Sequence, residues 1–299
     1  MKTITIGTDC SGIEAPIEAL TQMKIPFIQK WCCEIDDFAR KSSSANYRMP
    51  ENIYTDMLKR NNKDLPHVDL YVCGFPCQAF STSGLRLGTK DPRAKIIPKM
   101  LDTISKSKPK ICILENVKGF INIEAGEPVK LLLKTLEKIG YNVHHSLYNT
   151  KNYGIPQNRE RIYFVCIRKD LQKKIFEKPR EVKMKAFEDI LIDDRVHDKP
   201  VSKMYNKNFH KIKSNTKIIT PYNYYTPYQD ISPTLDTACS YFFIIKQNRV
   251  LYEKEALQLQ GFRKNFKQVV SRNQMMKQVG NSMSVNVVKK IIKEALLCI

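Results

Sequence analysis

The sequence of 299 residues has no apolar run near the roughly 20 residues that a membrane-spanning helix needs. This absence argues against a membrane protein of the helical kind. Residues 1–4 run directly into an apolar segment, with no separate hydrophobic region and no small-residue cleavage site. We therefore expect no signal peptide, and a location in the cytoplasm.

Paired cysteines and metal-ligand clusters are also lacking. The nine cysteines are an odd number at irregular spacing, which argues against a disulfide framework and fits a reducing compartment. Cys73 and Cys77 are four residues apart, but no second Cys or His pair stands at a spacing typical of zinc ligands. We expect no structural metal.

Acidic residues are scarce relative to basic ones. The chain has 30 Asp and Glu against 50 Lys and Arg, a formal net charge of +20. Such an excess favours a polyanionic partner, most simply nucleic acid. A solvated lysine-rich surface is the alternative, so the charge needs site chemistry beside it.

Apolar runs alternate with helix-like stretches through the first half of the chain. Strands are predicted at residues 4–7, 27–33, 68–73, 111–114, 141–147 and 161–167, and helices at residues 16–23, 96–105, 129–139 and 284–297. This alternation predicts an α/β fold with a mainly parallel sheet. Ligands of such folds lie beyond the carboxyl ends of the strands.

Cys77 follows the third predicted strand, in the segment Gly-Phe-Pro-Cys-Gln-Ala-Phe-Ser at residues 74–81. A nucleophilic cysteine must be partly exposed and able to form a thiolate, and Pro76 fixes the backbone just before it. A buried structural cysteine is the alternative, and this segment alone favours neither interpretation.

Glu115 follows the next strand, where partial burial would raise its pKa and let it donate a proton. A surface Glu at a strand end is the commoner alternative.

Arg159 and Arg161 are two residues apart, so on a strand they share one face. They can orient a carboxylate or contact a base edge there, and a pair of surface charges is the alternative.

Together, Pro-Cys-Gln, Glu-Asn-Val and Gln-x-Arg-x-Arg resemble, in order and spacing, motifs of the cytosine-C5 DNA methyltransferase family. The likeness continues at residues 9–14, 153–156, 255–262 and 278–282, and leaves out only roughly residues 169–230. An ordered set of motifs is far more specific than any one of them. The sequence departs from the family at Cys10, usually an aromatic residue, at Glu14, usually a glycine, and at Lys254, usually an arginine.

The resemblance implies a Rossmann-like S-adenosylmethionine-dependent methyltransferase domain. It implies that Cys77 adds to C6 of cytosine, that Glu115 engages N3, and that Arg161 contacts the base near O2. Arg159 is expected to brace the site. Residues expected to contact the cofactor S-adenosyl-L-methionine are Asp9, Ser11, Gly12, Ile13, Glu34, Ile35, Asp56, Pro76, Asn281 and Ser282.

The family pattern also predicts two domains. A catalytic and cofactor-binding domain spans residues 1–169 and is completed by residues 271–299, and a smaller target-recognition domain spans residues 170–270. The target cytosine must be flipped out of the duplex, because its reacting atom cannot be reached inside it. Residues 80–93 are predicted to close over the DNA as a lid.

Contacts to DNA are predicted from two segments. In the first, Ser81, Arg86 and Lys90 lie in or beside the predicted lid. In the second, Lys203, Lys207 and Lys211 recur every four residues and share a face if that segment is helical, where they can follow phosphates. A solvated helix face is the alternative. Four tyrosines are expected in a loop beyond them: Tyr222, Tyr224, Tyr225 and Tyr228.

Three rival functions remain to be weighed. Relatives of the same fold that methylate tRNA carry a Cys-Phe-Thr signature, which this sequence lacks. Non-catalytic relatives usually lose the Cys or the Glu, and both are present. Exocyclic amino-group methyltransferases need a Pro-Pro pair, and none occurs. We therefore expect a DNA enzyme, a monomer of bacterial or viral source, associated with the nucleoid and paired with a cognate restriction endonuclease.

Overall fold

The computed structural model describes residues 3–76, 95–192, 218–220, 223–228 and 230–299. The chain divides into two compact units. The first holds Met1–Tyr148, Glu160–Arg180 and Val287–Ile299, and the second holds Asn149–Arg159 and Glu181–Asn286. None of the described helices is long and apolar enough to cross a membrane. The predicted division into a catalytic and a recognition domain concerns function, and it stays a prediction.

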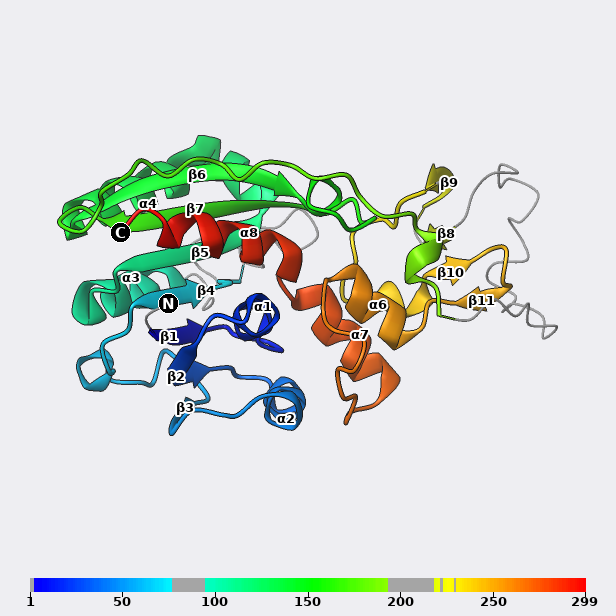
Figure 1. The fold of residues 1–299 in the computed structure, drawn as a ribbon, viewed down its shortest axis with the longest axis horizontal. Coiled ribbons are helices and arrows are strands. Elements are labelled where there is room, and N and C mark those ends of the chain that lie inside the picture. Colours follow the sequence, from blue (N-terminus) through cyan, green and yellow to red (C-terminus); the bar gives the residue numbers. More distant parts are fainter. Residues whose placement is uncertain (1–2, 77–94, 193–217, 221–222, 229) are drawn as a thin grey trace. The chain divides into compact units, whose positions relative to one another are not determined.

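The first unit is built on a seven-stranded sheet (Figure 1). Its strands are β1 (Ile4–Asp9), β2 (Phe27–Cys33), β3 (Asn52–Tyr54), β4 (Leu70–Cys73), β5 (Ile111–Val117), β6 (Tyr141–Asn149) and β7 (Glu160–Arg168). They lie in the order β3-β2-β1-β4-β5-β7-β6. Neighbours from β3 to β5 pair in parallel, and β7 is antiparallel to β5. The predicted mainly parallel sheet is confirmed.

Helices cover both faces of this sheet, because successive side chains of a strand point to opposite sides. The helices are α1 (Ala15–Met23), α2 (Asp37–Asn46), α3 (Ile96–Ser107), α4 (Glu127–Ile139) and α8 (Val285–Leu296), with short 3-10 helices η1 (Asn62–Asp64) and η4 (Lys118–Gly126). Cys112 and Leu114 of β5 belong to the core cluster of α3 and α4. The alternate residues Ile111 and Ile113 are equally buried. In Figure 1, α8 lies in front of the strands and α4 behind them.

The second unit has a four-stranded antiparallel sheet in the order β11-β10-β8-β9. Its elements are β8 (Ile218–Thr220), β9 (Asn223–Tyr228), β10 (Phe243–Ile244), β11 (Arg249–Val250), α6 (Glu253–Leu259), α7 (Arg272–Asn281) and the 3-10 helices η5 (Thr150–Asn152), η6 (Glu188–Ile190) and η8 (Cys239–Tyr241). The loop predicted for the tyrosine-rich segment is wrong, because residues 223–228 form β9. Tyrosine favours strands, and an edge strand tolerates the missing N–H of Pro227.

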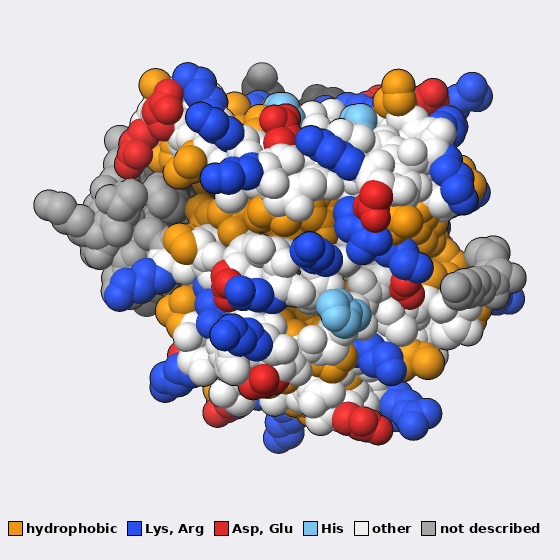
Figure 2. All heavy atoms as spheres, turned by 90° about the vertical axis from the view of Figure 1, so that its left-hand side faces the viewer, with side chains coloured by type: hydrophobic (Ala, Val, Ile, Leu, Met, Phe, Trp, Pro, Cys, Tyr) orange, Lys and Arg blue, Asp and Glu red, His pale blue; other side chains and the backbone are white. Residues whose placement is uncertain are grey.

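Basic side chains are spread over the face that Figure 2 shows rather than gathered in one place on it. Figure 2 shows lysine and arginine scattered across one whole face of the molecule, with fewer acidic side chains between them and an apolar band across the middle. The net positive charge therefore does not by itself single out a nucleic-acid-binding surface on this face.

Candidate active site

The register of the sheet brings the predicted site residues to one edge. Tyr54, Cys33, Asp9, Cys73 and Leu114 are successive partners across β3, β2, β1, β4 and β5. The carboxyl ends of parallel strands meet at one edge of a sheet, where ligands bind. Predicted site residues follow this row within two positions along the sequence: Ser11, Glu34, Asp56 and Glu115.

Glu34 links the loop after β1 to the start of α2. Its Oε2 accepts a hydrogen bond of 2.7 Å from the backbone N of Gly12, and its Oε1 accepts one of 2.9 Å from that of Asp36. Asp36 in turn caps α2 by accepting from the backbone N of Phe38 and Ala39. The half-buried carboxylate is thus held in one orientation at the edge, with lone pairs left for a ligand hydroxyl.

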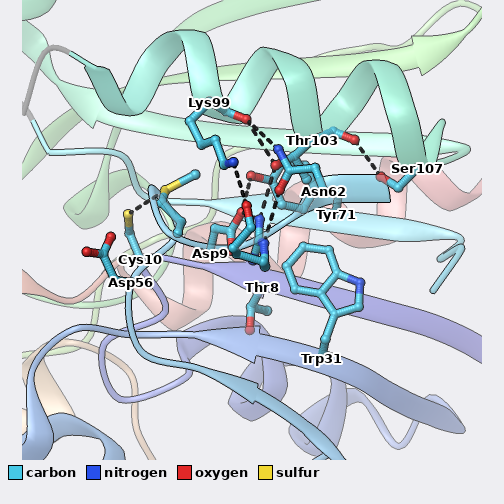
Figure 3. A network of polar contacts seen from close by, with 12 residues as sticks. Thr8, Asp9, Cys10, Trp31, Asp56, Asn62, Tyr71, Lys99, Thr103 and Ser107 are labelled. Atoms are coloured by element: carbon cyan, nitrogen blue, oxygen red, sulfur yellow. Dashed lines mark hydrogen bonds and ion pairs between the residues drawn. The ribbon is translucent and has the colours of Figure 1, made fainter. Parts of the chain in front are cut away.

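The loop at Gly12 leaves room beside its backbone. Gly12 has φ +53°, a conformation that favours glycine, and an added Cβ would meet no atom of the described residues within 4 Å. Asp56 is half-buried, and its Oδ1 accepts from the backbone N of Leu58 at 2.9 Å. In Figure 3 its carboxylate points away from the neighbouring polar network. Two acceptor groups and an open loop therefore line this part of the edge.

Asp9 has a different environment from the other predicted cofactor residues. It is 1% exposed. Its carboxylate oxygens accept from Arg60 at 2.6 and 2.8 Å, and Oδ2 also accepts from the hydroxyl of Tyr71 at 2.9 Å. Burial, and then the charge of Asp9, raise the pKa of Tyr71, which keeps that hydroxyl a donor. Asp9 therefore positions the loop and does not present its carboxylate at the edge.

The remaining predicted cofactor residues differ in exposure. Ile13 is fully buried in the core, whereas the side chain of Ile35 is 73% exposed. Ser11 and Pro76 are partly exposed. Ile13 can therefore contribute only its backbone to a ligand site, while Ile35 offers an apolar side chain beside Glu34.

Glu115 and Arg161 face each other on neighbouring strands. In the antiparallel pair of β5 and β7, Glu115 lies opposite Tyr163 and Val117 opposite Arg161. Arg161 Nε is 3.4 Å from Glu115 Oε1, and the two side chains are 16% and 11% exposed. The pair brings a carboxyl group and a guanidinium together at the partly buried end of β5.

Asn116 ties this pair to the segment that leads to Cys77. Its Nδ2 donates to the backbone oxygen of Phe75 at 3.2 Å. The Phe75 ring packs edge-on against Phe120, with centroids 5.3 Å apart. Phe75 is thus fixed two residues before Cys77. We did not predict Asn116 as a site residue, although it stands inside the Glu-Asn-Val motif.

Arg159 belongs to the second unit, although only one residue separates it from Arg161. It is 3% exposed and donates to the backbone oxygens of Leu235 at 2.7 Å and Ser282 at 2.8 Å. A guanidinium that donates to two backbone carbonyls can brace those segments, and the predicted role of Arg159 in bracing the catalytic site stays a prediction.

Asn281 and Ser282 also belong to the second unit. Their predicted place at the start of the last helix is wrong. Asn281 is the last residue of α7, Ser282 caps that helix at its carboxyl end, and α8 begins only at Val285. Asn281 is exposed and Ser282 is buried. The sequence signal could not separate α7 from α8, since buried residues continue through residues 282–285.

Several predicted residues lie outside the described part of the chain. They are the catalytic Cys77 and the DNA contacts Ser81, Arg86, Lys90, Lys203, Lys207 and Lys211. Tyr222 lies outside it too, as do the predicted lid and the predicted lysine-bearing helix. These predictions stand on the sequence.

Comparison with known proteins identifies the family. The model of the family described as C-5 cytosine-specific DNA methylase matches residues 1–232 and 191–296. The chain belongs to this family. The recognised motifs, the α/β fold and the order of the strands all agree with that membership.

Named relatives of the chain are methyltransferases. The Type II methyltransferase M1.ScrFI of Lactococcus lactis subsp. cremoris is 34% identical over 88% of this chain and 70% of its own length. The Type II methyltransferase M.HhaI of Haemophilus parahaemolyticus is 29% identical over 86% of this chain and 84% of its own. These two relatives and the matched family support methyltransferase activity for this chain.

Solved structures share the fold across the whole chain. The S. pombe Dnmt2 methyltransferase has a TM-score of 0.74 at 21% identity, covering 98% of each chain. The Entamoeba histolytica methyltransferase EhMeth has a TM-score of 0.71 at 20% identity, covering 99% of this chain and 98% of its own. The chain therefore shares its fold with these methyltransferases.

Proposed function

We propose that the chain is a DNA (cytosine-5-)-methyltransferase with Cys77 as its nucleophile. The observation that carries the proposal is the pairing of Glu115 with Arg161, 3.4 Å apart at the end of β5. Asn116, next to Glu115, holds Phe75 two residues before Cys77. An acid, a guanidinium and a thiol are the groups that addition to a cytosine ring requires.

S-adenosyl-L-methionine is the proposed cofactor, and it supplies the methyl group as an electrophile. The residues present fit it, because Glu34 and Asp56 offer acceptors on neighbouring strands and the loop at Gly12 leaves open space. In this proposal Glu34 binds the ribose hydroxyls, Asp56 the adenine amino group and Ile35 the adenine face. Ser11 and Gly12 border the methionine part, and Ile13, Pro76, Asn281 and Ser282 complete the set.

The chain's own residues divide the reaction into easier steps. The Cys77 sulfur bonds to C6 of a cytosine flipped out of the duplex, and the electron pair of the C5–C6 double bond moves to C5. Glu115 at N3 and Arg161 near O2 hold the charge that develops in the ring. After C5 is methylated, a base removes the C5 proton, the double bond returns and the Cys77 thiolate leaves.

The proposed substrate is duplex DNA, as the names of the relatives suggest. Those names include Type II methyltransferases and an orphan methyltransferase of a Bacillus phage. The Type II names support a role in restriction-modification with a cognate endonuclease, and the orphan name marks a methyltransferase without one as the alternative. We propose a monomer in the cytoplasm, associated with the nucleoid, whose residues 170–270 read the target and whose residues 80–93 close over it.

The test is methyl transfer from labelled S-adenosyl-L-methionine to mixed duplex DNA by the wild type and by Cys77→Ser, followed by bisulfite sequencing. We expect cytosine C5 methylation that depends on Cys77, at one short recognition sequence. Labelling of tRNA instead would reject DNA as the substrate. Tight DNA binding without transfer to either nucleic acid would show a non-catalytic module.

A further inference from the structure

Arg60 is a buried cation that none of the recognised motifs contains. It is 5% exposed, and it stands four residues after Asp56. A buried charge needs a paired and fully hydrogen-bonded environment. The groups that surround Arg60 therefore show which segments of the chain it holds together.

The guanidinium of Arg60 is held on three sides. Its Nη1 and Nη2 donate to the two oxygens of Asp9, and Nη2 also donates to the hydroxyl of Thr103 at 3.1 Å. Its Nε donates to Asn62 Oδ1 at 3.1 Å. Burial alone would lower the pKa of Arg60, but the hydrogen bonds and charge of Asp9 outweigh it and raise that pKa above its ordinary value.

Aromatic rings complete the surroundings of Arg60. Its Cζ lies 4.9 Å from the ring centre of Trp31 and 5.2 Å from that of Tyr54. A planar cation over aromatic rings is attracted by their electron-rich faces, and arginine suits this better than lysine. Trp31 belongs to β2 and Tyr54 to β3, so the contacts reach the strands that lead to Glu34 and Asp56.

The network joins the two loops that border the proposed cofactor site. Asp9 ends β1 just before the loop at Gly12, and Arg60 follows Asp56 on the loop after β3. The same two loops touch again where Cys10 Sγ lies 3.9 Å from Met57 Sδ. Figure 3 shows Asp9, Asn62, Tyr71 and Thr103 converging, with Cys10 and Asp56 at one side of the network.

Helix α3 is fastened to the same network. The Nζ of Lys99 donates to the backbone oxygen of Arg60 at 2.6 Å. Asn62 Nδ2 donates to Asp102 Oδ2 at 2.8 Å. The guanidinium of Arg60 itself reaches α3 through the hydroxyl of Thr103. Arg60 therefore links β1, the loop after β3 and α3.

We propose that Arg60 is a positioning residue for the cofactor. It fixes the spacing between the loop at Gly12 and Asp56, so that both ends of S-adenosyl-L-methionine meet a preformed site. The inference rests on the proposed function, and it goes beyond it by assigning this role to a residue outside the motifs. Preformed sites bind more tightly because the ligand does not have to order them.

The matched control is Arg249 in the second unit. It also donates to both oxygens of a buried carboxylate, at 2.8 and 2.6 Å from Glu255, and its Cζ lies 4.0 Å from the ring centre of Tyr252. Loss of either arginine leaves a buried carboxylate uncompensated, so both variants lose stability. Only the Arg60 variant should lose cofactor affinity.

The experiment measures calorimetric binding of S-adenosyl-L-methionine to the full chain without DNA, together with thermal unfolding. We expect Arg60→Lys and Arg60→Met to raise the Kd about tenfold or more, because a small misplacement of binding groups has effects of this size. Arg249→Met should lower the Tm and leave the Kd unchanged. With DNA present, Arg60→Lys should raise KM for the cofactor about tenfold and leave kcat within about threefold.

The outcomes separate the inference from the function. If the wild type binds S-adenosyl-L-methionine and Arg60→Lys binds it equally well, Arg60 only stabilises the fold. If Arg60→Met loses no more affinity than Arg249→Met, the same conclusion follows. If the wild type itself does not bind the cofactor, the proposed function fails and the inference with it. Because Arg60→Lys keeps the cation, it remains informative should Arg60→Met not fold.

Discussion

The two arginines of the Gln-x-Arg-x-Arg motif, one in each unit, have different partners. In the first unit, Arg60 and Arg161 face the carboxylates of Asp9 and Glu115 at or near the sheet edge that carries the candidate site. In the second, Arg159 is held by two backbone carbonyls. A guanidinium facing a carboxylate at an open edge can serve chemistry, whereas one that donates to main-chain oxygens can brace the backbone that carries them.

The Gln-x-Arg-x-Arg motif crosses from one unit to the other. Arg159 is the last residue of its segment of the second unit, and β7 begins at Glu160 in the first. Sequence spacing alone places the two arginines on one strand face. Their different environments predict that substitutions at the two positions have different consequences.

The largest expected effect is on activity. Glu115→Gln keeps the size of the side chain and removes its charge, so methyl transfer should fall about 100- to 10,000-fold. Thermal unfolding should change little. Glu160→Gln is the matched control, since Glu160 forms an exposed ion pair with Lys118. Equal rates for Glu115→Gln and the control in a methyl-transfer assay would remove Glu115 from the reaction.

The next effect is on stability and sharpens the contrast within the motif. Arg159→Met removes the donor to the backbone oxygen of Leu235 and one of the two donors to that of Ser282, which keeps Gln260 Nε2, so the free energy of unfolding should fall by about 3 kcal/mol. Urea denaturation measures it, with the exposed Lys254→Met as control. Arg161→Met should instead reduce methyl transfer and change unfolding less. Equal stability losses in the two arginine variants would contradict the distinction.

A pH-dependent effect is expected at Glu14, which is 1% exposed. Burial raises the pKa of its carboxyl to about 7, against hydrogen bonds from Gln29 and Thr8 that lower it. Between about pH 4.5 and 7 the folded chain keeps a proton that the unfolded chain has lost, so stability falls as pH rises through this window. Above about pH 7 stability no longer changes with the ionisation of Glu14.

Glu14→Gln removes that dependence. The variant should gain stability relative to the wild type as pH rises from about 4.5 to 7, by at most about 3 kcal/mol, and the difference should then stay constant. Chemical denaturation at several pH values measures it. A difference that does not change with pH would show that Glu14 does not titrate in this range.

The smallest effect is expected at an exposed ion pair. Lys118 and Glu160 lie 2.8 Å apart with side chains 54% and 42% exposed. Lys118→Met should change the free energy of unfolding by less than about 0.5 kcal/mol. A larger loss in urea denaturation would mean that surface charge near β5 stabilises the first unit in a way that the buried pairs do not explain.

Much of the first unit could be predicted because its signals are local. Leu70–Cys73 and residues 111–114 are continuous apolar runs, and α4 ends where Gly140 takes φ 113°. Helix α2 has only three buried residues in ten and β3 is three residues long, so neither gives a clear periodic signal. The second unit depends on pairings between short strands, which sequence patterns describe poorly.

The sequence could predict which residues belong to the candidate site better than how those residues are arranged. Motifs pointed to Glu34, Asp56, Glu115 and Arg161, which the structure brings to one edge of the sheet. They could not show that Arg60, 51 residues away in the sequence, neutralises Asp9. Such a partner follows from tertiary packing, and no local pattern marks it.

The most direct test of the account is covalent capture of the target base. Duplex DNA with 5-fluorocytosine at the recognition cytosine blocks the last step, because fluorine at C5 cannot leave as a proton. With S-adenosyl-L-methionine present, the account predicts a stable adduct between this DNA and the chain, mapped by mass spectrometry to Cys77 and absent from Cys77→Ser. An adduct at another residue, or methyl transfer to ordinary DNA by Cys77→Ser at the wild-type rate, would contradict it.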